Sequence, residues 1–271
     1  MGYDKIFDLT GQTAVVTGAL GKLGPIWLEA LLSFGANVFA MDHPDAKSSK
    51  RFNSLKDEYG AKRVHLAYAD IMNRAALVKA LDKCVDNFGI PHILVNNAGI
   101  DLPPEPGASY ALEDIPEEKF MPALLVNVSG LFQVTQVFGG AMIKQGRGSI
   151  INIGSLYASV SPNKALYDHI DCEPPFIKPP AYGASKAAVL NLTRYFATHW
   201  GSKGVRVNAL SPGGVLGGQD EEFKRKFSER TPLGRLAVAE DLAGPLVFLA
   251  SSASSYVTGV NLPVEGGYTA W

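Results

Sequence analysis

Short runs of β-forming residues alternate along this chain with longer segments of helical spacing, and this alternation constrains the fold most strongly. The expected strands are Thr13–Thr17, Asn37–Met41, Val64–Tyr68, Ile93–Asn96, Ser149–Ile153, Val205–Leu210 and Asn261–Val264. The expected helices are Leu23–Phe34, Ser49–Tyr59, Arg74–Asn87, Phe120–Lys144, Gly183–Trp200 and Ala239–Ala250. Nearly all the strand runs are continuously apolar, as strands buried on both faces of a parallel sheet must be. The sequence therefore predicts a doubly wound, Rossmann-like α/β fold with right-handed crossovers.

Length and composition fit one globular domain over residues 1–271. No linker, internal repeat or low-complexity segment divides the 271 residues, of which 46% are hydrophobic and 19% charged. This is ample material for a buried core. Two long segments, 101–116 and 161–180, interrupt the alternation of strands and helices. Loops of this length in a compact domain are usually functional, so we expect substrate loops there.

Charge and cysteine usage exclude several classes of partner. Lys and Arg total 25 and Asp and Glu total 26, so the net charge is −1 and offers no basic excess for nucleic acid. Cys84 and Cys172 fit neither a zinc-ligand spacing nor a disulfide framework, so we expect no metal site and a reducing cytoplasm. Residues 1–9 lack a secretory signal, and the apolar stretch 124–143 contains too many polar residues for a membrane span.

A loop with three spaced glycines follows the first strand. Gly18, Gly21 and Gly24 stand between that strand and the first helix. Glycines allow a tight turn and a close approach of the backbone, so a pyrophosphate can lie on the unpaired N–H groups of the helix N-terminus. The position within the first strand–helix–strand unit predicts dinucleotide binding.

The second expected strand leads into Asp42, whose carboxylate can accept hydrogen bonds from the adenosine ribose. A carboxylate there repels a 2′-phosphate, so we predict NAD rather than NADP. His43 or Lys22 could offset this repulsion, although Lys22 also fits an ordinary solvated lysine at a helix start. Asp70 fits equally well a hydrogen bond to adenine and a helix cap.

Several further motifs occur in order along the chain. They are Asn96-Asn97-Ala98-Gly99, Asn127 within a helix, Ser155 after a strand, Tyr182-Gly183-Ala184-Ser185-Lys186, and Ser211-Pro212-Gly213-Gly214. Together they make the chain resemble the short-chain dehydrogenase/reductase family over essentially its whole length. The resemblance implies a seven-stranded parallel sheet of order 3-2-1-4-5-6-7, a homotetramer or homodimer, and a small-molecule substrate.

The resemblance also implies the residues of the site. The implied catalytic residues are Asn127, Ser155, Tyr182 and Lys186. The implied cofactor contacts are Gly18, Leu20, Gly21, Lys22, Leu23, Asp42, Asp70, Ile71, Asn97, Ala98, Gly99, Tyr182, Lys186, Pro212, Gly213 and Val215.

Elementary chemistry supports the tyrosine–lysine pair. Tyr182 and Lys186 are four residues apart, so they share one face of a helix. A nearby ammonium and a positive nicotinamide both favour phenolate, so we predict that the pKa of Tyr182 is lowered toward the range of a general base. In the family's roles Tyr182 is the general acid/base and Ser155 holds the substrate oxygen. Lys186 also holds the nicotinamide ribose, and Asn127 supports a proton path through water.

The glycine spacing departs from the pattern of single-domain family members. Residue 22 is Lys, so the glycines follow GxxGxxG, which is typical of the extended branch that modifies nucleotide sugars. This spacing raises an alternative function, an epimerase or dehydratase with recycled NAD. The short remainder after Gly213 and the Asn96-Asn97-Ala98-Gly99 motif favour alcohol/ketone redox chemistry instead.

The distance from Ser155 to Tyr182 is also unusual, at roughly twice the separation common in the family. Tyr167 fits the usual distance, but Asp171 stands where its lysine should be, so we prefer Tyr182. An insertion within about 161–180 then lies over the active site. Its polar side chains favour a hydroxylated or carboxylated substrate, although ordinary solvated charges would give the same pattern; they are Lys164, Tyr167, Asp168, His169, Asp171, Glu173 and Lys178. Such an insertion resembles those of bacterial sugar-pathway oxidoreductases.

The C-terminal part contains a second region expected to face the substrate. Residues 215–231 resemble the family's lid, with hinge glycines before it and a charged helix that opens near Asp220. Phe223 and Phe227 share one face of this helix and either face the substrate or pack in the interior. The tail 259–271 resembles the family's last strand and a segment that contributes to subunit interfaces.

These features predict an NAD-dependent oxidoreductase that interconverts a secondary alcohol and a ketone, in a sugar-like or sugar-acid substrate. A redox-sensing NAD-binding protein without catalysis is a third possibility, and the intact tetrad argues against it.

Overall fold

The computed structural model describes residues 5–101 and 109–271. Two sequence predictions therefore fall partly outside the described residues. They are the absence of a signal in residues 1–9, and the first long loop, 101–116.

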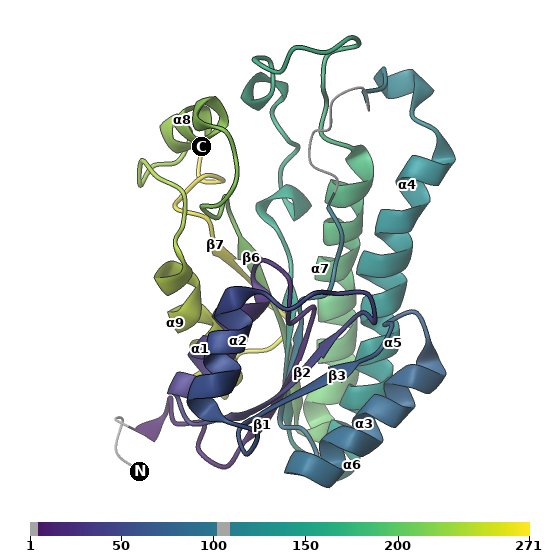
Figure 1. The fold of residues 1–271 in the computed structure, drawn as a ribbon, viewed down its shortest axis with the longest axis vertical. Coiled ribbons are helices and arrows are strands. Elements are labelled where there is room, and N and C mark those ends of the chain that lie inside the picture. Colours follow the sequence, from purple (N-terminus) through teal and green to yellow (C-terminus); the bar gives the residue numbers. More distant parts are fainter. Residues whose placement is uncertain (1–4, 102–108) are drawn as a thin grey trace.

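The strands form one parallel sheet of seven, in the order β3-β2-β1-β4-β5-β6-β7, as predicted (Figure 1). Their bounds are β1 Thr13–Thr17, β2 Asn37–Asp42, β3 Val64–Tyr68, β4 Ile93–Asn96, β5 Gly148–Ile153, β6 Val205–Pro212 and β7 Asn261–Val264. β1 and β4 are adjacent in the sheet, and further strands are added on opposite sides of this pair, so the strand order reverses between them. Open α/β sheets bind ligands outside the carboxyl ends of strands at such a switch point.

The helices occur where the sequence predicts them, with shifts at some ends. Their bounds are α1 Gly24–Ser33, α2 Lys50–Tyr59, α3 Arg74–Phe88, α4 Glu117–Leu124, α5 Leu131–Val134, α6 Gly140–Gln145, α7 Pro180–Trp200, α8 Glu221–Glu229 and α9 Ala239–Ala250. Short 3-10 turns lie at Leu112–Asp114, Leu156–Ala158, Lys164–Leu166, Gly201–Lys203 and Ser252–Ser254. The single helix expected over Phe120–Lys144 starts earlier, at Glu117, and contains two π-helical segments, Leu125–Gly130 and Thr135–Gly139.

Two hydrophobic cores cover the two faces of the sheet. Ala14 and Val16 of β1 pack with α1, α2 and α9, whereas Val15 points to the other face and packs with α3, α6 and α7. Figure 1 shows these helices on opposite sides of the strands. Most residues of the inner strands are therefore buried whichever way they point, which is why these strand sequences are continuously apolar, whereas the edge strands β3 and β7 are more exposed.

Among the described residues, one helical run, Glu117–Gln145, is long and apolar enough by composition to cross a membrane. The prediction that this stretch is too polar for a span is therefore wrong by that criterion. In the fold, Val134, Phe138 and Met142 of this run pack into the core on one face of the sheet. Core helices pass the same composition test, so composition alone does not make this run a membrane helix.

A third group of buried side chains lies beyond the carboxyl ends of the strands. We name it the aromatic cluster; its buried members are Leu156, Leu166, Tyr167, Phe176, Phe227, Leu236 and Tyr268. It joins the insertion at 161–180, helix α8 and the C-terminal tail, which lie at the upper end of the molecule in Figure 1. The sequence segments predicted to face the substrate are therefore packed against one another.

Gly24 fixes how closely α1 approaches the loop that precedes it. A Cβ at this position would lie 2.3 Å from the carbonyl oxygen of Ala19, which is closer than any Cβ contact allows. By contrast, a Cβ at Gly140, which also lies in a helix, would meet no atom within 4 Å.

We therefore expect Gly24→Ala to lower the free energy of unfolding by roughly 1–3 kcal/mol, because backbone must move to admit the methyl group. The matched Gly140→Ala should leave it unchanged or raise it by up to about 1 kcal/mol, because alanine favours the helix. Equilibrium unfolding in urea measures both values. Equal stability of the two variants would contradict the packing role of Gly24.

Candidate active site

Hydrogen bonds tie the glycine loop after β1 to the end of β4. The Thr17 hydroxyl accepts the backbone N–H groups of Asn97 and Ala98, each at 3.0 Å. The Asn97 amide nitrogen donates to the Thr17 and Gly18 carbonyls, and its oxygen accepts the indole N–H of Trp27 at 2.8 Å. Gly18 has φ +63° and leaves no room for a Cβ beside Ala98. Asn97 and Ala98 therefore hold the loop in shape, and Thr17 and Trp27 assist them although the sequence analysis did not single them out.

The loop offers a binding site for phosphate groups. Within the described part of the chain, the backbone N–H groups of Lys22, Leu23 and Gly24 have no acceptor. They lie at the N-terminus of α1, where unpaired N–H groups and the helix dipole favour an anion. Gly21 adds no side chain to this edge. These residues fit the pyrophosphate of a dinucleotide, whereas the Leu20 N–H is already bound to Asp42.

Asp42 lies beside the glycine loop at the end of β2, as predicted. Its two carboxylate oxygens accept the backbone N–H groups of Leu20 and His43, each at 2.7 Å. The side chain remains half-exposed. These bonds fix a negative charge where a ribose is expected.

Lys22 differs from the solvated lysine that the sequence favoured. Although part of the side chain is exposed, its ammonium donates to the Val215 carbonyl at 2.9 Å, and burial lowers its pKa. Lys22 therefore joins the glycine loop to the segment after β6. Such a contact between residues so far apart in sequence has no local signal.

Asp70 and Ile71 lie between β3 and α3. The Asp70 carboxylate accepts the Met72 N–H at 2.9 Å, and Asn73 caps α3 by accepting the Ala76 N–H at 3.1 Å. Asp70 thus stabilises the turn before the helix, close to the capping role that was one alternative. Ile71 packs on Gly130, where a Cβ would lie 2.5 Å from its terminal carbon.

Asn127 lies in the first π-helical segment and is buried. Its amide accepts the Ile100 N–H at 2.8 Å and donates to the Ile100 carbonyl and the Ser185 hydroxyl, each at 3.0 Å. A Cβ on Gly99 would lie 3.0 Å from the Asn127 oxygen and 3.7 Å from the Lys186 ammonium. Asn127 therefore fixes the chain after β4 next to the predicted catalytic lysine. π-Helical segments often occur at functional sites.

Tyr182 and Lys186 share one face of α7, as predicted. The Lys186 ammonium lies 5.8 Å from the centre of the Tyr182 ring and donates to the Ile153 carbonyl at 2.8 Å. Ser155, the residue that caps the turn after β5, accepts the Tyr157 N–H at 3.2 Å, and its hydroxyl lies near enough to the Tyr182 phenol to lower the pKa of that phenol. Three of the four predicted catalytic side chains therefore meet at the carboxyl ends of β4 and β5.

The predicted lowering of the Tyr182 pKa relied on Lys186 and on a bound nicotinamide, and it does not occur in the protein alone. Burial raises the pKa of Tyr182 to about 12, the charge of Asp101 adds to the rise, and the nearby Ser155 hydroxyl opposes it. Burial also lowers the pKa of Lys186 to about 8. Burial removes the hydration of each charged form and so disfavours both the phenolate and the ammonium. The sequence identified Tyr182 and Lys186 as a pair, but it did not indicate how deeply their side chains are buried.

The insertion places the Tyr167 ring in the aromatic cluster. Its ring centre lies 5.2 Å from that of Phe176 and 5.6 Å from that of Phe223, inside the aromatic cluster. Phe227 of α8 stacks on Tyr268 with ring centres 4.8 Å apart. Of the two interpretations of Phe223 and Phe227, packing therefore describes Phe227, which is buried.

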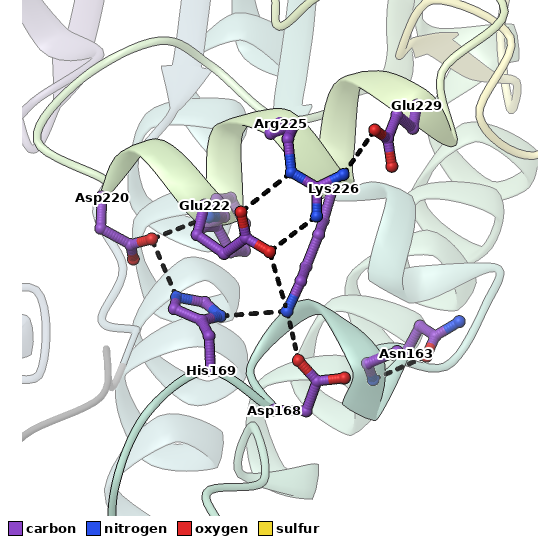
Figure 2. A network of polar contacts seen from close by, with 10 residues as sticks. Asn163, Asp168, His169, Asp220, Glu222, Arg225, Lys226 and Glu229 are labelled. Carbon is purple, nitrogen blue, oxygen red and sulfur yellow. Dashed lines mark hydrogen bonds and ion pairs between the residues drawn. The ribbon is translucent and has the colours of Figure 1, made fainter.

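Most polar residues of the insertion face α8 or solvent. Figure 2 shows His169 bound to Asp220 at 2.8 Å, and Lys226 bound to Asp168. Lys164, Asp171 and Glu173 are exposed, as the solvated alternative predicted. Lys178 differs, because its side chain is nearly buried and its ammonium lies 5.0 Å from the centre of the Tyr182 ring.

The segment after β6 closes the site on its other side. The Gly213 N–H donates to the Val264 carbonyl at 3.0 Å, directly after Pro212 ends β6. The Val215 carbonyl accepts both Lys22 and the Gln219 side chain. A Cβ on Gly214 would lie 2.6 Å from the Phe227 ring, so packing against α8 requires a glycine there.

The fold and this site together define a Rossmann-type oxidoreductase that uses a dinucleotide. Residues 12–168 match a family described as "short chain dehydrogenase", and residues 174–269 match one described as "Enoyl-(Acyl carrier protein) reductase". The chain belongs to the short-chain dehydrogenase/reductase family and is an oxidoreductase that acts on CH–OH groups with a nicotinamide cofactor.

Similar proteins match the chain over its whole length. The chain is 36% identical to 2-dehydro-3-deoxy-D-gluconate 5-dehydrogenase of Bacillus subtilis, over 99% of each chain. It is 34% identical to galactitol 2-dehydrogenase (L-tagatose-forming) of Cereibacter sphaeroides, over 100% of each. A crystal structure of gluconate 5-dehydrogenase from Burkholderia cenocepacia, in complex with NADP and tartrate, is 29% identical, covers 98% of each chain and has a TM-score of 0.84.

Proposed function

We propose that this protein is an NAD-dependent dehydrogenase that interconverts a secondary alcohol and a ketone in a sugar-like or sugar-acid substrate. The observation that carries the proposal is the meeting of Tyr182, Lys186 and Ser155 at the carboxyl edge of the sheet. The names of the similar proteins support the substrate class, because they describe dehydrogenases of sugar acids and of a polyol.

In this proposal each residue of the site has a defined role. The nicotinamide cofactor, when bound, exchanges the hydride with the substrate carbon. Tyr182 takes the alcohol proton at its phenol oxygen, or returns it in the reduction. Ser155, whose hydroxyl lies near that phenol, holds the substrate oxygen next to it. Lys186 stabilises the phenolate and holds the ribose, and Asn127 fixes the chain at Ile100 and supports a path for the proton through water.

The remaining cofactor contacts follow from the glycine loop. The N–H groups of Lys22 and Leu23 would hold the pyrophosphate, and Asp42 the adenosine ribose. Gly99 leaves room for the nicotinamide half beside Asn127 and Lys186. Pro212, Gly213 and Val215 would close over it from the end of β6.

We also propose how the protein assembles and where it is located. A homodimer or homotetramer fits the large apolar side chains exposed on the helices of one sheet face, Leu125, Phe132 and Tyr195. The exposed Trp271 at the end of the chain fits a tail that meets another subunit. We propose a cytoplasmic enzyme that acts as one domain over residues 1–271.

We expect Tyr182→Phe to reduce turnover of a polyol or aldonate by about 10²- to 10⁴-fold, because the hydroxyl that moves the proton is gone. Binding of the reduced cofactor, followed by fluorescence, should survive. The matched Tyr167→Phe variant should keep its activity, since Tyr167 lies in the aromatic cluster. Net formation of NADH by the wild type would separate this function from an epimerase or dehydratase, and full activity of Tyr182→Phe would rule out the assigned base.

Asp42 should make the wild type bind NADH more tightly than NADPH, because its carboxylate repels the 2′-phosphate. We expect Asp42→Asn to gain about tenfold in affinity for NADPH, which corresponds to about 1.4 kcal/mol. Fluorescence titration with each reduced cofactor measures the dissociation constants. Tighter binding of NADPH by the wild type would contradict the preference.

A further inference from the structure

Lys178 and Asp101 form an ion pair directly beside Tyr182. Lys178 ends the insertion, just before α7, and only 7% of its side chain is exposed. Its ammonium lies 2.7 Å from both carboxylate oxygens of Asp101, in the segment that follows β4. The same ammonium lies 5.0 Å from the ring centre of Tyr182 and 6.0 Å from that of Tyr157.

Among the described residues, the charged groups that face Tyr182 come from three elements. Lys186 comes from α7, Lys178 from the insertion and Asp101 from the segment after β4. Ser155 and Tyr157, both after β5, are the neutral hydroxyl-bearing neighbours. The Tyr157 hydroxyl is buried and has no hydrogen-bond partner in the described chain, so it does not pair with the ammonium. Asp101 is therefore the anion that balances Lys178.

The two charges of the pair act on Tyr182 in opposite directions. A carboxylate disfavours phenolate and an ammonium favours it. The charge of Asp101 raises the pKa of both Tyr182 and Lys186, so its field reaches the whole site. The Lys178 ammonium, 5.0 Å from the centre of the Tyr182 ring, opposes the effect of Asp101 on the phenol.

We propose that Asp101 and Lys178 are positioning residues whose opposite charges set the pH range in which Tyr182 moves the substrate proton. The inference rests on the proposed function, because it needs Tyr182 as the base. The proposal gives the insertion a role in the chemistry, because the insertion brings a second cation, Lys178, next to Tyr182. The segment after β4 brings the carboxylate of Asp101, whose charge opposes that of Lys178.

Single substitutions should move the acid limb of the pH profile of kcat/KM for alcohol oxidation in opposite directions. Lys178→Met leaves Asp101 unbalanced, so the pKa of Tyr182 rises and the limb shifts up by about one pH unit. Asp101→Asn leaves Lys178 unbalanced, so the limb shifts down by a similar amount. In the double variant D101N/K178M neither charge remains, and the limb should return close to that of the wild type.

A second ion pair in the same insertion provides the control. Asp168 and Lys226 join the insertion to α8 rather than to Tyr182 (Figure 2). D168N and K226M should therefore leave the limb where it is, even if they change the KM. Circular dichroism checks that each variant is folded, and if K178M does not fold, the downward shift of D101N alone decides.

Opposite shifts that the double variant cancels would support the proposal. Shifts in the same direction, or no shift in folded D101N, would overturn it, provided that Tyr182→Phe is inactive. Full activity of Tyr182→Phe would instead remove the base itself, so failure of the proposed function is distinguished from failure of the pair.

Discussion

Burial of Tyr182 beside Lys186 is the constraint on which the rest of the site depends. Burial disfavours a phenolate and an ammonium alike, so the pKa of the phenol rises while that of the amine falls. A neutral phenol has no free site for the proton of an alcohol, so the proposed base needs further positive charge next to it. A nicotinamide in its oxidised form would supply such a charge. Under the proposed function, burial therefore makes the base depend on the cofactor that the reaction needs.

The surrounding elements keep these groups in place by different kinds of contact. The parallel sheet fixes Ser155 and Ile153 at the end of β5, and Asn127 locks the chain after β4 through both backbone groups of Ile100. The insertion is held mainly by the aromatic cluster, whose ring pairs each add about 0.5–1.5 kcal/mol beyond simple burial. The exposed ion pairs in Figure 2 contribute little stability because water screens them, and they serve to orient the insertion on α8.

The sequence predicted what depends on local pattern. The strands and the glycine loop follow from periodicity and spacing, and the structure puts both where expected. The choice of Tyr182 over Tyr167, which rests on an i, i+4 lysine, stays a prediction, and the structure places Tyr182 and Lys186 on one face of α7. Prediction from the sequence failed where contacts between distant segments determine the structure. The bond from Lys22 to Val215 and the ion pair of Lys178 with Asp101 join residues with no local relation. The raised pKa of Tyr182 depends on burial by several elements, which no motif records.

The most direct measurement is an ultraviolet titration of the Tyr182 phenolate, taken as wild type minus Tyr182→Phe, with and without the oxidised cofactor. Without cofactor we expect the phenolate only at strongly alkaline pH, because the pKa is about 12. With oxidised cofactor bound we expect it at clearly lower pH, since a positive charge then faces the phenol. Formation at the same pH in both conditions, in an enzyme that turns over its substrate, would contradict the dependence of the base on the cofactor.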